Sequence, residues 1–179
     1  KESGRSLLWS IAATTLLAAI FAAWVASLPT SKPDFSVLWG AVRIDEPYDP
    51  SALAAHLGWG PNEMPATFVY PPSALPIFAI LGRISLDLAV TVWAALSGAV
   101  LAWSSRSHWA PLLIFTPAML WALPNGQTSI LMGALAFGGL QMLHRPSLAG
   151  VLFGVALSLK PQLVILIPLA LLVTRHWHV

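Results

Sequence analysis

Four of the seven acidic residues of this chain lie in one short segment, residues 32–50 (KPDFSVLWGAVRIDEPYDP). They are Asp34, Asp45, Glu46 and Asp49. Carboxylates gathered in this way can act as general bases, bind a divalent cation, or simply face water. The chain as a whole is 57% hydrophobic and only 9% charged, so this segment differs sharply from its surroundings. Any chemistry that needs carboxylates is expected here.

Asp34 stands at the start of a pattern typical of a short amphipathic helix. Four apolar residues follow at helical spacing on one face: Phe35, Leu38, Trp39 and Val42. Such a helix would lie on a membrane surface, with Trp39 at the level of the lipid headgroups. The Asp34 carboxylate could cap the helix, contributing about 1 kcal/mol, or act as a general base. Spacing alone favours the cap.

The sequence after this helix, EPYDPSALAAHLGWG, predicts a turn braced by proline and then a short helix that starts at Ser51 and stops at a glycine. Asp45, Glu46 and Asp49 could together bind a divalent cation. Their spacing fits no defined cation loop, so an acidic turn in water is the favoured interpretation. His56 has no second ligand near it and is expected at the membrane interface. The sequence therefore predicts no metal site and no cofactor.

Two polar patches interrupt the apolar sequence further along. LPNGQTS, residues 123–129, places Asn125 and Gln127 between apolar runs, although an Asn-Gly pair can also be a simple turn. SLKPQL places Lys160 and Gln162 in an otherwise uncharged stretch. A charge at membrane depth costs roughly 2.5–3.5 kcal/mol on insertion scales. Lys160 therefore either extends to the membrane interface or binds an anion.

Residues 7–28 carry no charge and are long enough to cross a hydrocarbon core of roughly 30 Å. A cleaved signal peptide is the alternative, but its apolar part is usually about 7–15 residues long. Further apolar runs follow at 71–82, 86–104, 109–123, 127–143, 147–159 and 161–174. Several are too short to cross a membrane alone, which is typical of broken or re-entrant helices.

The sequence therefore predicts an all-α, polytopic transmembrane bundle forming a single membrane domain, 1–179. Its parts are a first span at 7–28, an outer loop at 29–70 with short amphipathic helices, and short and broken membrane helices at 71–174. The chain has no Cys, which excludes disulfides, thiolate metal sites and Cys nucleophiles. The net charge of +2 is spread over separate basic positions and does not indicate a nucleic-acid surface.

The positions of Lys and Arg predict the orientation. If the basic N-terminus is cytoplasmic, residues 29–70 lie outside. The remaining basic clusters also favour the cytoplasm: Arg106, His144–Arg145 and Arg175–His178. Residues 125–127 and Lys160 then share the outer side with the acidic loop, provided that 71–104 crosses once and begins with a re-entrant part. Seven full spans are the alternative, and they would leave three basic clusters outside.

Several segments together resemble the ordered motifs of glycosyltransferase family 87, a GT-C-type membrane family that includes mycobacterial polyprenol-phosphate-mannose-dependent α-mannosyltransferases. They are PDFSVLWGA and EPYDP in the acidic segment, FVYPP (68–72), NGQ (125–127) and GVALSLKPQ (154–162). Two features depart from the family: Asp45 stands where a small residue is expected, and 179 residues is about half of a usual member. The chain also starts without Met and ends on TRHWHV. We interpret it as a fragment, the N-terminal half of a longer protein.

The resemblance implies that Asp34 is a general base that takes a proton from an acceptor hydroxyl as its oxygen attacks the anomeric carbon of a sugar. The polyprenyl phosphate would leave from the opposite face, which inverts the configuration. Lys160, and after it Arg43, would bind the departing phosphate. The residues expected to bind sugar or acceptor are Tyr48, Asp49, Tyr70, Asn125, Gln127 and Gln162.

The sequence thus predicts an inverting membrane glycosyltransferase that moves a sugar, with mannose expected, from a polyprenyl-phosphate donor to a lipid- or glycan-linked hydroxyl. It would work on the extracytoplasmic side of a bacterial plasma membrane, with donor, acceptor and membrane lipids as partners and no nucleic acid. A transporter or lipid-carrier subunit with broken helices around an anion site is the alternative. That class would explain Lys160 but not the acids gathered in one loop. A structural or inactive remnant is the third possibility.

Overall fold

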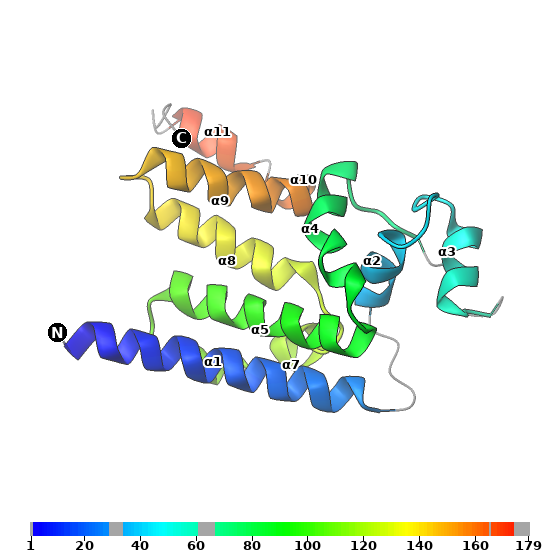
Figure 1. The fold of residues 1–179 in the computed structure, drawn as a ribbon. Helices are drawn as coiled ribbons and strands as arrows, with labels where there is room; N and C mark the ends of the chain where they lie inside the picture. Colours follow the sequence, from blue (N-terminus) through cyan, green and yellow to red (C-terminus); the bar gives the residue numbers. More distant parts are fainter. Residues whose placement is uncertain (1, 29–33, 61–66, 165, 174–179) are drawn as a thin grey trace.

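The computed structural model describes residues 2–28, 34–60, 67–164 and 166–173. The described residues form α-helices and short 3-10 helices, with no strand among them, as the composition predicts. Four long helices make up the body of the molecule: α1 (Glu2–Ala26), α5 (Leu86–Ser105), α8 (Thr128–Gln141) and α9 (Pro146–Leu159). Figure 1 shows them side by side in the order α1, α5, α8, α9.

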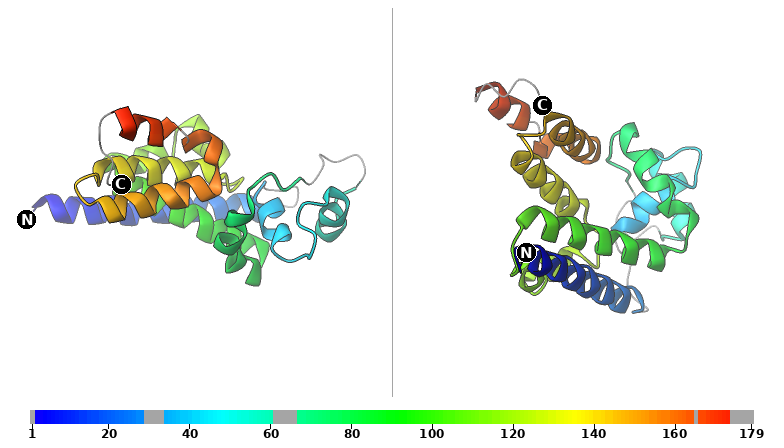
Figure 2. Two further views of the ribbon diagram at one scale, coloured as in Figure 1. Left: turned by 90° about the horizontal axis from the view of Figure 1, so that it is seen from above. Right: turned by 60° about the vertical axis from the view of Figure 1, so that its left-hand side comes forward.

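Short helices form a group that we call the loop module, residues 34–60 and 67–83. Its elements are α2 (Phe35–Ala41), α3 (Pro50–Leu57), η1 (Pro72–Ala74), α4 (Leu75–Ala79) and η2 (Leu81–Arg83). Figure 2 shows this group, coloured from blue to green, at one end of the long helices. The other short helices are α6 (Ala110–Leu113), α7 (Pro117–Ala122), α10 (Pro161–Val164) and α11 (Leu166–Val173). The apolar runs 71–82 and 109–123 are thus broken into short helices.

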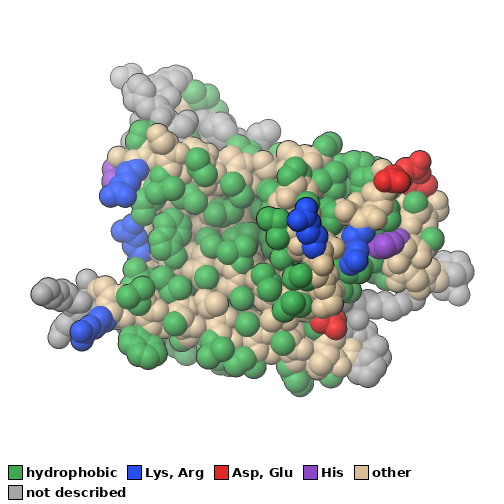
Figure 3. All heavy atoms as spheres, viewed as in Figure 1, with side chains coloured by type: hydrophobic (Ala, Val, Ile, Leu, Met, Phe, Trp, Pro, Cys, Tyr) green, Lys and Arg blue, Asp and Glu red, His purple; other side chains and the backbone are tan. Residues whose placement is uncertain are grey.

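The two ends of the bundle differ in charge. Basic residues mark the end where α1 begins: Arg5 in α1, Arg106 at the end of α5 and Arg145 before α9. Hydrogen bonds from Ser10 to the Ser107 carbonyl (2.8 Å) and from Gln141 to the Ser104 carbonyl hold this end together. The described acids other than Glu2 belong to the loop module or the first turn of α5: Asp34, Asp45, Glu46, Asp49 and Asp87. Figure 3 shows acidic side chains only at the loop-module end of this face, with some basic ones beside them.

α1 packs on α5 through small residues and turns its large residues outward. Its buried side chains are spaced four residues apart: Ser10, Thr14, Ala18 and Ala22. They meet Gly98 of α5, where an added Cβ would lie 3.0 Å from the Cβ of Ala18 and 3.1 Å from the carbonyl oxygen of Thr14. Large apolar side chains of α1 are exposed: Leu8, Trp9, Leu16, Ile20 and Trp24. Close contact through small residues is typical of helices in lipid, whereas a helix in water buries its large apolar face.

By length and composition, two described helices are able to cross a membrane, Gly4–Ala26 and Leu86–Ser105. The predicted first span is therefore helical, although the helix begins at Glu2 and ends at Ala26 rather than covering 7–28. α8 and α9 are apolar but shorter. Crossing by more than two helices stays a prediction.

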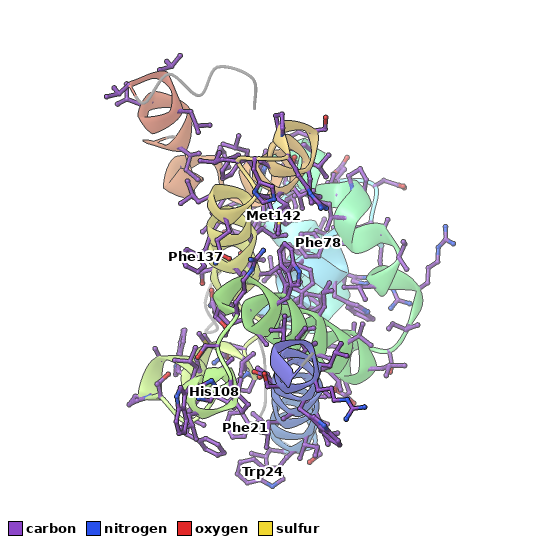
Figure 4. All side chains as sticks on the ribbon, turned by 90° about the vertical axis from the view of Figure 1, so that its left-hand side faces the viewer. Phe21, Trp24, Phe78, His108, Phe137 and Met142 are labelled. Atoms are coloured by element: carbon purple, nitrogen blue, oxygen red, sulfur yellow. The ribbon has the colours of Figure 1, made fainter. Side chains whose placement is uncertain are left out.

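Aromatic side chains attach the loop module to the bundle. Phe35 of α2, Phe78 of α4 and Trp93 of α5 are at most 1% exposed, and their ring centroids lie 5.1–5.9 Å apart. Aromatic pairs at such spacing stabilise by more than their buried area alone. Figure 4 looks from the end where α1 begins and shows Phe78 between α5 and the loop module, with Phe21 and Trp24 on the far side of α1. This cluster fixes Asp34, the residue before Phe35, relative to the bundle.

α2 does not lie separately on a membrane surface as the sequence suggests. Residues on several sides of it are buried: Phe35, Ser36, Leu38, Gly40 and Ala41. The indole N–H of Trp39 donates a hydrogen bond of 2.9 Å to the carbonyl oxygen of Ile84. The indole N–H of Trp39 therefore has its hydrogen-bond partner within the protein, because the loop module folds back over the start of α5.

Candidate functional site

A pocket of about 300 Å³ opens beside the start of α2. Its walls come from four parts of the described chain: the start of α2, the residue after the C-cap of α3, the segment before η1, and the loop before α8. The lining residues are Asp34, Val37, Leu38, Trp59, Thr67, Val69, Tyr70, Gly126 and Gln127. Three residues predicted to act in the site, Asp34, Tyr70 and Gln127, are thus brought together.

The Asp34 side chain is not used to cap α2. Asp34 has helical torsions (φ −55°, ψ −26°) and makes no side-chain capping hydrogen bond, whereas a capping residue usually has extended torsions. The N–H of Val37, which a capping side chain could bind, donates to the backbone carbonyl of Asp34 at 3.2 Å. The first N–H of the helix, that of Phe35, donates to the Asn125 carbonyl oxygen at 3.0 Å. The capping role that spacing favours is therefore wrong. The Asp34 carboxylate is exposed and accepts a hydrogen bond from the side-chain amide of Gln127.

Gly126 allows the loop before α8 to approach α2 this closely. Its φ is +65°, a left-handed conformation that residues with a Cβ rarely adopt. An added Cβ would lie 2.5 Å from the Cβ of Phe35. The sequence identifies Asn125-Gly126 as a turn, and the structure shows why this turn needs glycine.

Tyr70 connects the pocket to two further polar groups. Its hydroxyl and the hydroxyl of the buried Thr128 are 3.0 Å apart and share a hydrogen bond. Burial raises the pKa of the Tyr70 hydroxyl above its ordinary value, the bond with Thr128 opposes this, and the negative charge of Asp34 adds to it. Tyr70 therefore keeps its proton at physiological pH and remains a hydrogen-bond donor.

Lys160 lies over the ring of Tyr70, with its Nζ 5.7 Å from the ring centroid, within the range of a cation–π contact. Its charge also interacts with that of Asp34. Lys160 follows the last residue of α9, and Pro161 comes next. A residue before proline is driven out of the helical region, and Lys160 has φ −144° and ψ 83°. The Lys-Pro pair thus ends α9 and directs the ammonium toward the site.

The residues that line the pocket do not include Lys160, Arg43 or Gln162, which are also expected in the site. The guanidinium carbon of Arg43 lies 4.0 Å from the ring centroid of Trp39, which it covers. Gln162 lies in α10 and is exposed. Of the two residues expected to bind phosphate, Lys160 is the one that interacts with Asp34.

Asp49 is used in the local structure of α3. Its carboxylate accepts hydrogen bonds from the backbone N–H of Ser51 (2.8 Å), the hydroxyl of Ser51 (2.7 Å) and the backbone N–H of Ala52 (3.4 Å). The side-chain bond from Ser51, followed by the two backbone bonds, lowers the pKa of Asp49 below its ordinary value. These bonds occupy Oδ1 of Asp49. The residue that the family resemblance assigns to sugar or acceptor binding thus caps α3.

Tyr48 and Asn125 also make local bonds. The hydroxyl of Tyr48 donates to the carbonyl oxygen of Tyr70 at 3.0 Å, which ties the acidic turn to the pocket wall. The side-chain amide of Asn125 donates to the carbonyl oxygen of Trp121 at 2.7 Å. Both side chains therefore bond to the backbone of segments that line or adjoin the pocket, and neither is among the residues that line it.

Sequence reasoning did not select several residues of the pocket. Thr128, which the sequence places with Asn125 and Gln127 between two apolar runs, does not line the pocket and bonds to Tyr70. Trp59, Thr67 and Val69 carry no signal in spacing or type, and only the folding of the loop brings them to Asp34. Among the described residues, no group of three or more His, Cys, Asp or Glu side chains could hold a metal ion.

A comparison with protein-family models matches residues 68–179 to glycosyltransferase family 87. The match covers more than half of the chain and includes Tyr70, Gln127 and Lys160, but starts after Asp34. Neither the comparison with curated proteins nor the one with solved structures gives a match.

Proposed function

Because the chain belongs to glycosyltransferase family 87, we propose that it transfers a sugar from a polyprenyl-phosphate donor to a hydroxyl group of an acceptor, with inversion at the anomeric carbon. Family membership and two apolar helices indicate a membrane glycosyltransferase. The donor, the acceptor and the residues that act on them are the subject of the proposal.

In the proposed reaction the acceptor hydroxyl gives its proton to Asp34 while its oxygen forms a bond to the anomeric carbon. The bond between that carbon and the phosphate oxygen breaks, and the polyprenyl phosphate leaves with the electron pair. The Lys160 ammonium would stabilise the charge that develops on the phosphate. Tyr70, which lines the pocket and lies under the Lys160 ammonium, would donate a hydrogen bond to the sugar or the phosphate.

One observation carries the proposal: the carboxylate of Asp34, which has no capping role, lines a pocket, and the Lys160 ammonium, which lies over the ring of the lining residue Tyr70, interacts with the Asp34 charge. A base and an anion ligand so near one pocket suit a reaction in which a hydroxyl group loses a proton and a phosphate departs. Mannose as the sugar, and a lipid- or glycan-linked hydroxyl as the acceptor, are proposed because the chain belongs to glycosyltransferase family 87, which includes α-mannosyltransferases.

The distribution of charge supports an extracytoplasmic site. Arg5, Arg106 and Arg145 lie at one end of the bundle. The cations of the loop module, Arg43 and Arg83, lie among acids instead. We therefore assign the first end to the cytoplasmic side, and the loop module then faces outward. The exposed large apolar side chains of α1 fit contact with lipid between these ends. A donor anchored in the outer leaflet would reach the pocket at the membrane surface.

The proposal is tested by incubating sealed vesicles of known orientation with radiolabelled polyprenyl-phosphate mannose and an acceptor that cannot cross the membrane. We expect label in the acceptor only when the loop module faces the acceptor, with an inverted anomeric bond in the product. Donor that binds without ever losing its sugar would overturn the proposal and favour the carrier alternative. Polyprenyl-phosphate glucose is the matched control for sugar specificity.

A further inference from the structure

Gln127 contacts the proposed base directly. Its side-chain amide donates to Oδ2 of Asp34 across 93 positions of sequence. Among the described residues, Gln127 is the one that hydrogen-bonds to the Asp34 side chain. Spacing and family resemblance assign Gln127 only to sugar or acceptor binding, whereas the structure gives its N–H group a partner within the protein.

The backbone of Gln127 is held from two sides. Its N–H donates to the carbonyl oxygen of Ala122 at 2.9 Å, which closes the end of α7. The next residue, Thr128, starts α8 and is fully buried. The Gln127 side chain makes no capping bond to α8, so it is available to reach Asp34. Because the backbone of Gln127 is fixed in this way, its side chain can hold Asp34 in one orientation.

Asp34 needs such a partner. It is exposed, and its side chain makes no capping bond to α2. A carboxylate free to rotate would spend only part of its time directed at a hydroxyl group. The bond to Oδ2 limits that rotation and does not use Oδ1, which can accept a proton from a molecule in the pocket.

We propose that Gln127 is a positioning residue that orients the Asp34 carboxylate, so that one oxygen is held by the protein and the other accepts the proton of the acceptor hydroxyl. This inference rests on the proposed function of Asp34. It assigns the Gln127 N–H group to the enzyme rather than to the sugar. The contact joins the loop module to the start of α8, so the base is correctly oriented only when these two parts are docked.

The contact itself is tested without any substrate. The chain contains four Asp residues, so labelling with [4-¹³C]aspartate gives four carboxyl signals, of which the Asp34 signal is the one lost in Asp34→Asn. At neutral pH we expect Gln127→Met, which keeps the side-chain volume but removes the N–H donor, to move this signal. Gln141→Met is the matched control, because the side-chain amide of Gln141 donates a hydrogen bond to the Ser104 carbonyl at the other end of the same helix. An Asp34 signal at the same position in Gln127→Met as in the wild type would overturn the inference.

The consequence for catalysis is tested with the transfer assay. We expect Gln127→Met to lower kcat about 10- to 100-fold with KM for donor and acceptor almost unchanged, since misorientation affects the reaction and not binding. Gln127→Asn keeps the amide on a shorter side chain and should recover part of the rate. Gln127→Glu brings a second carboxylate to the first, which should move the acid limb of the pH–rate profile to higher pH. Gln141→Met should leave kcat and the pH profile as in the wild type.

Two failures are distinguishable. If KM rises in Gln127→Met and kcat does not fall, Gln127 binds the sugar and the positioning role is wrong, while the proposed reaction stands. If Asp34→Asn retains full activity, the proposed base is wrong, and the carboxyl signal still decides whether Gln127 holds Asp34. Should Gln127→Met fail to fold, Gln127→Asn gives the same comparison with a smaller change.

Discussion

The starts of α2 and α3 are two similar sequences with opposite outcomes. Each short helix follows an aspartate, Asp34 or Asp49, that lies next to a proline. Asp49 has extended torsions (φ −84°, ψ 111°) and its carboxylate caps α3. Asp34 has helical torsions, and a carbonyl oxygen from residue 125 accepts the first N–H of α2. One carboxylate is therefore used locally, and the other is left for the pocket.

This difference shows what distinguishes a structural acid from a candidate base in the same loop. Asp49 forms all its described bonds within three residues along the chain. Asp34 has its partner 93 positions away, and its neighbours in space, Tyr70 and Lys160, come from other parts of the fold. Substitution of Asp34 should consequently lower activity more than stability, and substitution of Asp49 should lower stability more than activity.

The largest effect is expected for Asp34→Asn. Because the side chain caps nothing, stability should stay close to that of the wild type, while loss of the base should lower sugar transfer about 10²- to 10⁴-fold. The measurements are the transfer rate and the thermal unfolding midpoint of the purified protein. Asp87→Asn, in the first turn of α5, is the control for loss of one carboxylate at this end. Transfer within a few-fold of wild type would eliminate Asp34 as the base.

The next largest effect is expected for Lys160→Met. Removing an oxyanion partner typically costs about 3–4 kcal/mol, or roughly 10²- to 10³-fold in rate. Membrane insertion should be kept, because Met removes the charge that burial penalises. Lys160→Arg should recover only part of the rate, since a planar guanidinium replaces a compact ammonium.

The control for Lys160→Met is Arg83→Met, which removes an exposed cation of η2 that does not line the pocket. Donor kinetics unchanged in Lys160→Met would mean that Lys160 only extends to the membrane interface. The phosphate role would then pass to Arg43, the other cation that the sequence suggests.

Gly126→Ala should disturb the start of α2, where the loop before α8 approaches Phe35. A left-handed conformation costs a residue with a Cβ about 1–2 kcal/mol, and the new Cβ would also collide with Phe35. We expect lower stability together with reduced transfer, because the loop that accepts the Phe35 N–H and holds Asp34 must move. Gly133→Ala is the matched control in α8. Its added Cβ meets nothing within 4 Å, so this substitution should be neutral or stabilise the helix by about 1 kcal/mol. Equal stability of the two variants would contradict the close approach.

The smallest effect is expected at Asp49. Asp49→Ala should lower the thermal unfolding midpoint slightly, and Asp49→Asn should restore it, because Asn is also a good capping residue. The folded-state pKa of Asp49 is lowered, so its contribution to stability is present above the unfolded-state pKa of about 3.9 and is lost as pH falls through the lower folded value. Wild type should therefore lose more stability than Asp49→Asn between about pH 4 and pH 2. Identical pH dependence in the two proteins would show that the cap contributes nothing.

Much of the local structure could be predicted from residue types. The apolar runs became helices, Gly58 ends α3 in the left-handed conformation, and Pro161 ends α9 beside Lys160. These features depend on the torsions that a residue allows and on whether its side chain avoids water. The family resemblance also pointed to Tyr70, Gln127 and Lys160, and their segments fall within the matched range.

The role of each polar group could not be predicted in the same way. Spacing gave Asp34 a cap, yet its side chain makes no capping bond and lines the pocket instead. The family resemblance assigned Gln127 to sugar or acceptor binding, whereas in the structure its side-chain amide donates a hydrogen bond to Asp34. Trp59 and Thr67 had no signal at all.

Chain-local chemistry thus accounts for the helices, their ends, the turn at residues 125–126 and the separation of basic from acidic segments. Only packing decides that the Asp34 carboxylate lines the pocket, since the groups around it come from other segments of the chain. Here the Phe35, Phe78 and Trp93 cluster docks α2 against α5, and Gly126 lets the loop before α8 come within reach. Contacts between residues so far apart in sequence form only when the whole hydrophobic core has assembled, because the entropy lost in closing such long loops must be offset by burial elsewhere.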